Sequence, residues 1–298
     1  VRTGGRYDGN LGVLAGLEVI ETLEQHGITT EHPFAVAFFT DEEGARFQPD
    51  MLGSLVYAGG MGLEEALDVV GIDGAVLGEE LDRIGYRGTS PCPGSAPRAF
   101  VELHVEQGPV LEADGVTIGA VTGVQGISWT ELAITGQSNH AGTTPMDLRH
   151  DPGYVAALIA SYVRQLAIRM GGRQVATVGS LELHPNLVNV VAASARLTVD
   201  LRNTDEALLG EAEADLARFV AEAAAAEGVT VEERTLARFQ PVAFDDRVVD
   251  TVAAVAAELG HSVKRLPSGA GHDAQMMARL CPTGMVFVPS RDGISHNP

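Results

Sequence analysis

The sequence predicts an α/β fold whose main domain is interrupted by a smaller α+β domain. Short apolar segments alternate with amphipathic ones in the first hundred residues, as strands and helices do in a layered α/β core. From about residue 121 the pattern changes to alternating strands and long helices, and after residue 229 the first pattern returns. We therefore expect a main domain made of residues 1–120 and 231–298, with an inserted domain at residues 121–230.

A helix and two strands account for the first part of the main domain. Apolar residues recur at helical spacing over residues 11–26, and Asn10 before them is of a residue type that caps helices. The segment at residues 34–40 is short, apolar and continuous, which predicts a fully buried strand, and residues 100–105 alternate apolar and polar. Polar residues gather where these strands end, and open α/β sheets bind their ligands at the carboxyl ends of strands.

The inserted domain is predicted from alternating strands and two long helices. Its strand-like segments are residues 127–134, 174–183 and 187–201, and its helices are residues 151–170 and 205–227. This pattern describes an α+β unit whose sheet is covered on one face. The main domain then resumes with helices at residues 245–259 and 273–280 and strands at residues 263–266 and 285–288.

Charge and composition exclude several classes of partner. The chain of 298 residues carries a net charge of −20, whereas nucleic acids and anionic membranes select for clustered Lys and Arg. No apolar run approaches the roughly 18 residues that span a bilayer. Cys92 and Cys281 lie far apart in the sequence, in neither a disulfide framework nor a thiolate metal pattern, so we expect a protein of the reducing cytoplasm.

The predicted strand at residues 34–40 ends in three consecutive carboxylates, Asp41, Glu42 and Glu43. Like charges in a row repel one another unless cations or hydrogen-bond donors neutralise them. A hydrated acidic surface turn is the alternative, but the position at the end of a buried strand favours a ligand site. Asp8 lies in a glycine-rich segment before the first helix, where it either caps that helix or belongs to the same site.

Histidines could supply imidazole ligands to a metal site alongside these carboxylates. His104 lies within a predicted strand, where a buried imidazole needs a partner, and His140, His272 and His296 lie in or after loops. The other histidines are at helix ends or in polar loops, where surface positions are the plain interpretation. Carboxylates and imidazoles without cysteine suit a hydrolytic zinc, manganese or cobalt centre. In a two-metal centre one carboxylate bridges the ions and another accepts a proton, and the two adjacent glutamates could divide the ligand and base duties.

Six motifs resemble the hydantoinase/carbamoylase family of zinc-dependent amidohydrolases, which includes N-carbamoyl-L-amino-acid hydrolases, β-ureidopropionase and allantoate amidohydrolase. They occur in the family's order over essentially the whole chain. The motifs are Gly5-Arg6-Tyr7-Asp8-Gly9-Asn10, Thr40-Asp41-Glu42-Glu43-Gly44, His104-Val105-Glu106-Gln107-Gly108-Pro109, Asn139-His140-Ala141-Gly142-Thr143, Asn186-Leu187-Val188-Asn189 and Ser268-Gly269-Ala270-Gly271-His272-Asp273. The resemblance implies a metallo-exopeptidase-like catalytic domain, interrupted by a smaller lid and dimerisation domain.

The resemblance also implies ligands for two divalent metal ions, zinc or else manganese, cobalt or nickel. Asp8 matches the carboxylate that bridges the ions, and Glu43, His104 and His296 match ligands of one ion or the other. Glu42 matches the general base. The family's first ligand, a histidine in a His-x-Asp motif, has no counterpart among the seven residues before Asp8, so we expect a fragment that lacks N-terminal strands and the C-terminal end.

For the substrate, the resemblance implies residues in both domains. Asn189 and Arg202 match contacts to the substrate carboxylate, and a guanidinium suits a bidentate bond with that group. His140 matches a histidine that stabilises the oxyanion, often across a dimer interface. Gln107 and Gly271 match further substrate-binding positions, Gly271 through backbone donors.

The implied activity is hydrolysis of a linear amide C–N bond, from an N-carbamoyl-L-amino acid to the amino acid, ammonia and carbon dioxide, by a homodimer joined through the inserted domain. Allantoate amidohydrolase is the alternative within the family, because no residue here decides between the two ureido substrates. A related exopeptidase or deacylase would share the metal carboxylates but not Asn189 and Arg202 together with the Gly-Ala-Gly-His-Asp loop. A non-catalytic scaffold protein would have eroded ligands, whereas the carboxylates and histidines named above are present.

Overall fold

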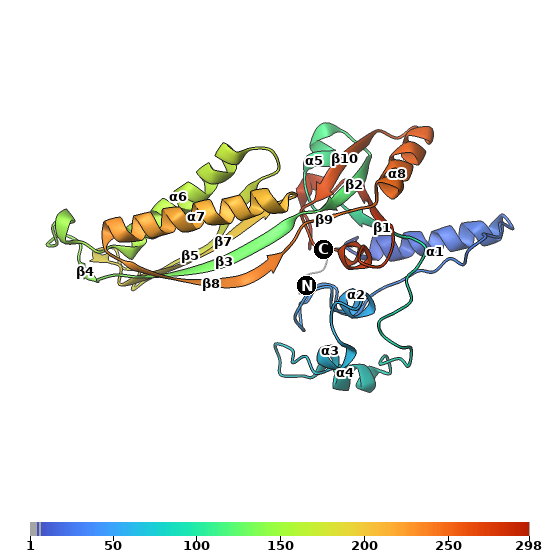
Figure 1. The fold of residues 1–298 in the computed structure, drawn as a ribbon, viewed down its shortest axis with the longest axis horizontal. Coiled ribbons are helices and arrows are strands. Elements are labelled where there is room, and N and C mark those ends of the chain that lie inside the picture. The colour runs from blue at the N-terminus through green and yellow to red at the C-terminus, as the bar shows by residue number, and fades with distance from the viewer. Residues whose placement is uncertain (1–4, 6, 298) are drawn as a thin grey trace. The chain divides into compact units, whose positions relative to one another are not determined.

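The computed structural model describes residues 5 and 7–297, which divide into two compact units (Figure 1). Unit 1 contains residues 1–124 and 243–298, and unit 2, residues 125–242, is inserted in it. The expected boundary at residue 230 is wrong. A strand that the sequence pattern did not reveal, β8 (Thr230–Phe239), pairs with β3 (Gly126–Thr135), so the inserted unit continues to residue 242.

Unit 1 is built on a five-stranded mixed sheet. Strand β1 (Phe100–Val105) is parallel to β11 (Thr283–Val288), which is antiparallel to β2 (Ile118–Val124). Strand β10 (Val263–Ser268) is parallel to β2, and β9 (Val242–Ala243) also pairs with β2. Its helices are α1 (Asn10–Gln25), α2 (Leu52–Tyr57), α3 (Leu63–Leu67), α4 (Leu77–Ile84), α5 (Val110–Asp114), α8 (Asp246–Glu258) and α9 (Asp273–Met277), with a 3-10 turn η2 (Arg291–Gly293).

The predicted strand at residues 34–40 is wrong. Residues 34–39 form an extended segment without regular structure, and Phe34 and Phe38 are 59% and 72% exposed. A strand needs a partner, and none of the described strands pairs with this segment. The acidic residues after it are nevertheless held in place, because the carbonyl groups of residues 40–42 accept hydrogen bonds from the backbone amides of residues 51–53.

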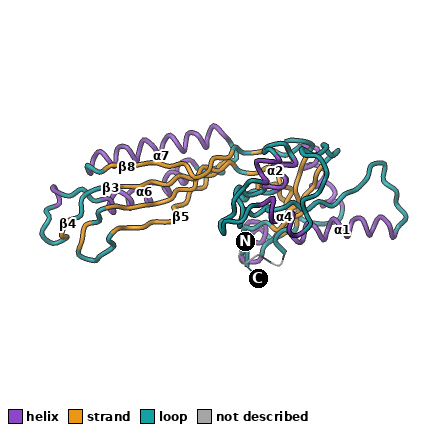
Figure 2. Tube along the Cα trace, turned by 90° about the horizontal axis from the view of Figure 1, so that it is seen from below, coloured by secondary structure: helices purple, strands orange, loops and turns teal. Residues whose placement is uncertain are grey.

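Unit 2 is a four-stranded antiparallel sheet in the order β5-β7-β3-β8, with two long helices packed along its strands (Figures 1 and 2). Its other elements are β5 (Val175–His184), β7 (Ser194–Asn203), α6 (Pro152–Met170), α7 (Glu206–Glu227), the short strands β4 (Asn139–His140) and β6 (Val190–Val191), and the 3-10 turn η1 (Met146–Leu148). Asp151 and Asp205 cap the two helices with their carboxylates. The core between sheet and helices contains Leu132, Ile134, Ile159, Leu166, Leu197 and Leu209, all buried. The predicted one-sided α+β unit is thus observed.

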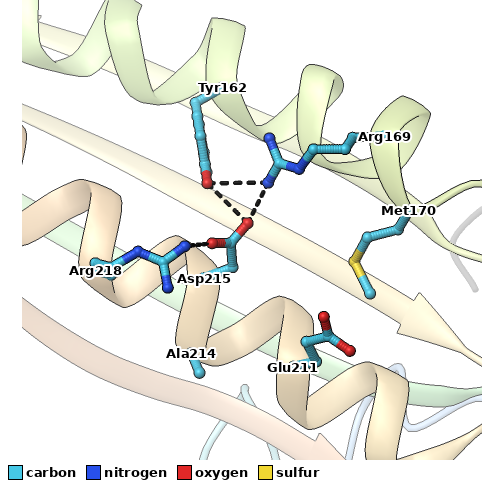
Figure 3. Close-up of a pocket in the computed structure, with 7 residues that line it drawn as sticks. All are labelled: Tyr162, Arg169, Met170, Glu211, Ala214, Asp215 and Arg218. Atoms are coloured by element: carbon cyan, nitrogen blue, oxygen red, sulfur yellow. Dashed lines mark hydrogen bonds and ion pairs between the residues drawn. The ribbon is translucent and has the colours of Figure 1, made fainter.

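A surface cavity of about 550 Å³ lies between α6 and α7 (Figure 3). Asp215 on α7 accepts a hydrogen bond from the Tyr162 hydroxyl on α6 and pairs with Arg169 and Arg218. The Tyr162 ring stacks on Phe219 with 3.8 Å between centroids. Because the carboxylate is fully engaged by residues of the two helices, we assign this cluster to holding α6 against α7. Across residues 5 and 7–297, no helix has the length and apolar character of a membrane span.

Helix α1 lies against the strand that carries His104. A Cβ atom at Gly12 would lie 2.5 Å from the carbonyl oxygen of Leu103, so only glycine permits this approach. The contact fixes the start of α1, and therefore Asp8 immediately before it, relative to the C-terminal end of β1.

We therefore expect Gly12→Ala to lower the free energy of unfolding by roughly 1–3 kcal/mol, because the added methyl group forces α1 away from β1. Gly210→Ala is the matched control: Gly210 lies within α7 with no atom within 4 Å of a built Cβ, so this change should raise stability by about 0.5–1 kcal/mol. Thermal and urea unfolding of both variants test the expectation, and equal shifts of the same sign would contradict it.

Candidate active site

Asp8 lies between two histidine rings. Its Oδ1 atom is 3.5 Å from His104 Nε2, and its Oδ2 atom is 3.5 Å from His296 Nε2. His296 Nε2 is also 3.6 Å from Glu43 Oε1. The Asp8 side chain is only 6% exposed, so its charge is largely removed from water. The structure thus brings together four of the predicted ligands from segments far apart in the sequence.

The sheet explains why these residues meet. His104 lies near the C-terminal end of β1, and His296 follows β11, the parallel neighbour of β1. Parallel strands present their carboxyl ends at the same edge of a sheet, where open α/β folds bind ligands. The His296 backbone amide also donates a hydrogen bond of 3.0 Å to Asp8 Oδ2, which holds the last segment against the first.

The donor set fits a pair of divalent metal ions. The 3.5, 3.5 and 3.6 Å separations are longer than N–H···O hydrogen bonds. They match the roughly 3.4 Å expected between two ligands that each lie about 2.1 Å from a tetrahedral ion. Because Asp8 faces a different histidine with each of its oxygens, it has the arrangement of a bridging carboxylate.

His104 is oriented by its own strand. Its Nδ1 atom lies 2.8 Å from the carbonyl oxygen of Val105, which identifies Nδ1 as the protonated nitrogen. The Nε2 lone pair is then directed toward Asp8, as a metal ligand requires.

Gln107 lies directly beside this group in a strained backbone conformation. Its φ angle is 56°, in the left-handed region that non-glycine residues rarely adopt. Its amide nitrogen is 3.1 Å from Asp8 Oδ1 and 3.2 Å from His296 Nε2. Its Oε1 atom is buried and has no hydrogen-bond partner among the described residues. A buried acceptor of this kind is suited to a ligand N–H group.

Glu42 lies in a field of other carboxylates. Burial, followed by the charges of Asp273 and Glu43, raises its pKa to about 8. Burial likewise raises the pKa of Glu102 to about 8 and that of Asp273 to about 6. Nearby cations would favour the ionised forms and lower these pKa values. With cations bound nearby, the Glu42 carboxylate would therefore be ionised more readily, as a proton acceptor beside predicted metal ligands must be.

Two further residues contact this site: Glu102, which no sequence pattern singled out, and His272, which the sequence offered only as one of several candidate imidazoles. Ligand atoms of Glu102, His104 and His272 lie within 4.8 Å of one another, so these three could also hold a metal ion. The His272 ring is buried 4.8 Å from the His104 ring, and burial holds its pKa well below the ordinary range, so it is neutral. Glu102 could have been found from its position two residues before His104, which places both side chains on one face of β1.

The loop before α9 is closed by the same histidine. His272 Nε2 is 2.8 Å from the Ser268 hydroxyl, which also bonds both backbone groups of Ala270. A Cβ atom at Gly271 would lie 3.0 Å from the Met51 methyl carbon, so the loop packs closely there. Gly271 thus lies one residue before His272, whose ring centroid is 4.8 Å from that of the predicted ligand His104.

His140 and Asn189 lie together at one end of unit 2. Strands β4 and β6 pair there, and the Ala141 amide bonds the Asn189 carbonyl at 2.9 Å. The His140 side chain is exposed, and its Nδ1 accepts a hydrogen bond of 3.1 Å from the Gly142 amide. The other ring nitrogen of the neutral form then carries the proton and can donate it to an anion.

Arg202 lies at the opposite end of unit 2. It is the ninth of ten residues in β7, whose first residue, Ser194, pairs with the ends of β3 and β5 next to His140 and Asn189. Eight residues of strand correspond to roughly 26 Å. Arg202 and Asn189 of one chain therefore do not reach a single carboxylate together.

Comparison with known proteins agrees with these observations. The chain matches the profile of the peptidase family M20/M25/M40 over residues 2–298. It is 41% identical over 295 residues to an N-carbamoyl-L-amino-acid amidohydrolase of Rhizobium meliloti, which covers 99% of this chain and 71% of that protein. It is 34% identical over 305 residues to a ureidoglycolate hydrolase of Arabidopsis thaliana, with 99% and 64% covered.

A crystal structure of an amidase of the hydantoinase/carbamoylase family from Burkholderia multivorans has the same fold. The TM-score is 0.97 at 47% sequence identity, over 99% of this chain and 72% of that one. The expected metallo-exopeptidase-like α/β fold is thereby confirmed. The matched profile, the sequence relatives and the shared fold agree, and the chain belongs to the peptidase family M20/M25/M40 and, within it, to the hydantoinase/carbamoylase amidases.

Proposed function

We propose that this protein is a metal-dependent hydrolase of linear amide C–N bonds that converts N-carbamoyl-L-amino acids into the amino acid, ammonia and carbon dioxide. The observation that carries the proposal is Asp8, buried between His104 and His296 with Glu43 and the proton acceptor Glu42 beside it. The named activity of the Rhizobium meliloti relative supports the substrate class.

In this proposal Asp8, Glu43, His104 and His296 hold two divalent ions, zinc or else manganese, cobalt or nickel. Bound divalent ions supply Lewis-acid polarisation of the carbonyl group and an activated water. Because the ligands are carboxylates and imidazoles, the donor set suits each of these metals. Glu102 and His272 lie next to His104, and the three together form a second group of side chains that could hold a metal ion.

The chain's own residues handle protons and orientation. Glu42 accepts the proton of the attacking water and returns it to the leaving nitrogen. The buried Oε1 of Gln107 accepts a hydrogen bond from the ureido N–H group of the substrate. A peptide substrate lacks the terminal NH2 of a ureido group, so this contact favours ureido substrates. The loop at Gly271 offers backbone donors to the substrate, and Arg202 binds its carboxylate.

We further propose a homodimer in which His140 and Asn189 serve the site of the partner copy. Within one chain these residues and Arg202 lie at opposite ends of unit 2, so one chain does not bring them to the same substrate. The end of unit 2 that carries His140 also exposes apolar side chains that an interface would cover. These are Met146, Leu148, Leu187 and Val188.

A ureido acid without an amino-acid carbon skeleton, such as ureidoglycolate or allantoate, is the second candidate substrate. The Arabidopsis thaliana relative, a ureidoglycolate hydrolase, favours it. Ammonia release from N-carbamoyl-L-amino acids, 3-ureidopropionate, ureidoglycolate and allantoate, each with zinc, manganese or cobalt, decides between them. No release from any substrate by protein with metal bound would refute the hydrolase proposal.

Two cysteines without a disulfide, Cys92 and Cys281, are consistent with a cytoplasmic enzyme.

We expect Glu42→Gln to lower kcat by about 10²–10⁴-fold without loss of metal, because the change removes the proton acceptor and no ligand. Glu43→Gln is the matched neighbour and should lose metal instead. Ammonia release together with metal content by mass spectrometry tests both variants. Metal loss in Glu42→Gln and retention in Glu43→Gln would show that the two roles are reversed.

The raised carboxyl pKa values predict how stability depends on pH. The folded metal-free protein binds protons at Glu42 and Glu102 up to about pH 8, whereas the unfolded chain releases them near pH 4.5. Stability should therefore fall as pH rises from 7 to 9, by about 1 kcal/mol for each group, or roughly 5 °C in Tm altogether. The buried neutral His272 has the opposite dependence, but only below its ordinary pKa near 6.5.

Calorimetric melting at pH 7 and pH 9, with chelator and with added zinc, measures this effect. Bound metal should remove most of the difference because it stabilises the ionised carboxylates. A Tm of the metal-free protein that rises over this interval would contradict the electrostatic description of the site.

The dimer proposal predicts complementation between two inactive variants. When Glu42→Gln and His140→Ala chains are mixed and allowed to exchange, half of the dimers are mixed, and one site in each mixed dimer contains both native residues. About a quarter of wild-type activity should return. No recovery, with exchange confirmed by native mass spectrometry, would show that His140 acts within its own chain.

A further inference from the structure

Two side chains of unit 2 hold Arg202 in one orientation. Its Nε atom is 3.0 and 3.1 Å from the two carboxylate oxygens of Asp200, and its Nη2 atom is 2.7 Å from Asp200 Oδ2. The guanidinium carbon also lies 5.8 Å from the centre of the Trp129 ring, within cation–π range. The bidentate contact fixes the plane of the guanidinium group, and the aromatic ring packs against it.

The sheet fixes these three residues in register. Asp200 and Arg202 are two residues apart on β7 and therefore point to the same face, and Trp129 on β3 pairs directly with Asp200. The alternating neighbours Val199 and Leu201 are buried in the core on the other face. A slip of one residue would expose them, so the core enforces the position of all three polar-face residues.

We propose that Asp200 is a positioning residue for substrate recognition: with Trp129 behind the guanidinium, it holds Arg202 in the orientation that receives the substrate carboxylate. This inference rests on the carboxylate-binding role proposed above for Arg202. An arginine side chain loses considerable rotamer freedom when it binds, and a preformed ion pair removes that freedom before the substrate arrives. Asp200 thereby selects substrates that carry a carboxylate.

The ion pair between Asp200 and Arg202 could also weaken substrate binding. Asp200 also neutralises the charge of Arg202, and neutralisation alone would weaken the attraction for a second carboxylate. If orientation dominates, removing the Asp200 charge weakens substrate binding. If neutralisation dominates, removing it strengthens binding.

The same sheet face offers a matched control. Glu131 on β3 accepts a hydrogen bond of 3.1 Å from Arg234 and lies 4.0 Å from Arg196. It is, like Asp200, a partly buried carboxylate paired with arginine on the sheet, but it does not contact Arg202. Glu131→Gln therefore reports the general effect of removing a carboxylate from this face.

The experiment measures kcat and KM with an N-carbamoyl-L-amino acid and with its uncharged carboxamide, in the full-length chain with metal bound. We expect Asp200→Asn to raise KM for the carboxylate substrate about tenfold, to change kcat less than twofold, and to leave KM for the carboxamide unchanged. Glu131→Gln should leave all four values unchanged. Trp129→Leu, which removes the cation–π contact and keeps the ion pair, should raise KM for the carboxylate substrate about two- to threefold.

Three outcomes overturn the inference. A lower KM in Asp200→Asn would show that Asp200 competes with the substrate. An equal rise for carboxylate and carboxamide, or a rise matched by Glu131→Gln, would show a merely structural role. If Asp200→Asn does not fold, as judged by thermal melting, Trp129→Leu decides in its place, and no carboxylate-specific rise refutes the proposal. Arg202→Ala tests the carboxylate-binding role of Arg202 separately from the positioning role of Asp200. An unchanged KM for the carboxylate substrate in Arg202→Ala refutes the role of Arg202 itself, whatever the result for Asp200→Asn.

Discussion

The buried carboxylate of Asp8 is the constraint on which unit 1 depends. A carboxylate removed from water must be matched by positive charge, and both of its oxygens face imidazole nitrogens at a spacing suited to shared cations. Burial raises the pKa values of the nearby Glu42, Glu102 and Asp273, and the charge of Asp273 adds to the rise for the two glutamates, so ionising these groups in the metal-free site opposes folding. In the proposed function, metal binding and the stability of unit 1 are therefore linked through the same few side chains.

Unit 2 follows a different principle. Its two capped helices and four strands enclose a continuous core of buried aliphatic side chains, and its predicted functional residues lie on parts of the sheet that this core fixes. Arg202 lies on a strand whose alternate residues are buried, and His140 lies where two short strands pair. In the proposed function, a rigid scaffold of this kind lets unit 2 supply recognition while unit 1 supplies the chemistry.

Local signals predicted the long helices well, because the spacing of apolar residues is encoded in neighbouring residues, but the predicted cap Asn10 is the first residue of α1 and Gly9 lies at the N-cap. Helices α6 and α7 begin directly after the aspartates that cap them. The strand expected at residues 34–40 failed because apolar composition does not supply a pairing partner, and β8 was missed because most of its side chains are exposed. In the site, motifs identified Asp8, His104 and His296. Asp200 could not be singled out, since an acidic residue in an alternating strand has the pattern of a solvent-facing one, whereas Glu102 could have been found from its spacing to His104 on β1.

The hydrogen bond between the His296 amide and Asp8 joins residues 288 positions apart. During synthesis at about 5–20 residues per second, the ribosome needs roughly 15–60 s to proceed from one to the other. Throughout that interval the nascent chain carries the first carboxylate without its last imidazole partner. The group around Asp8 is therefore completed late, after all residues of the inserted unit have been synthesised.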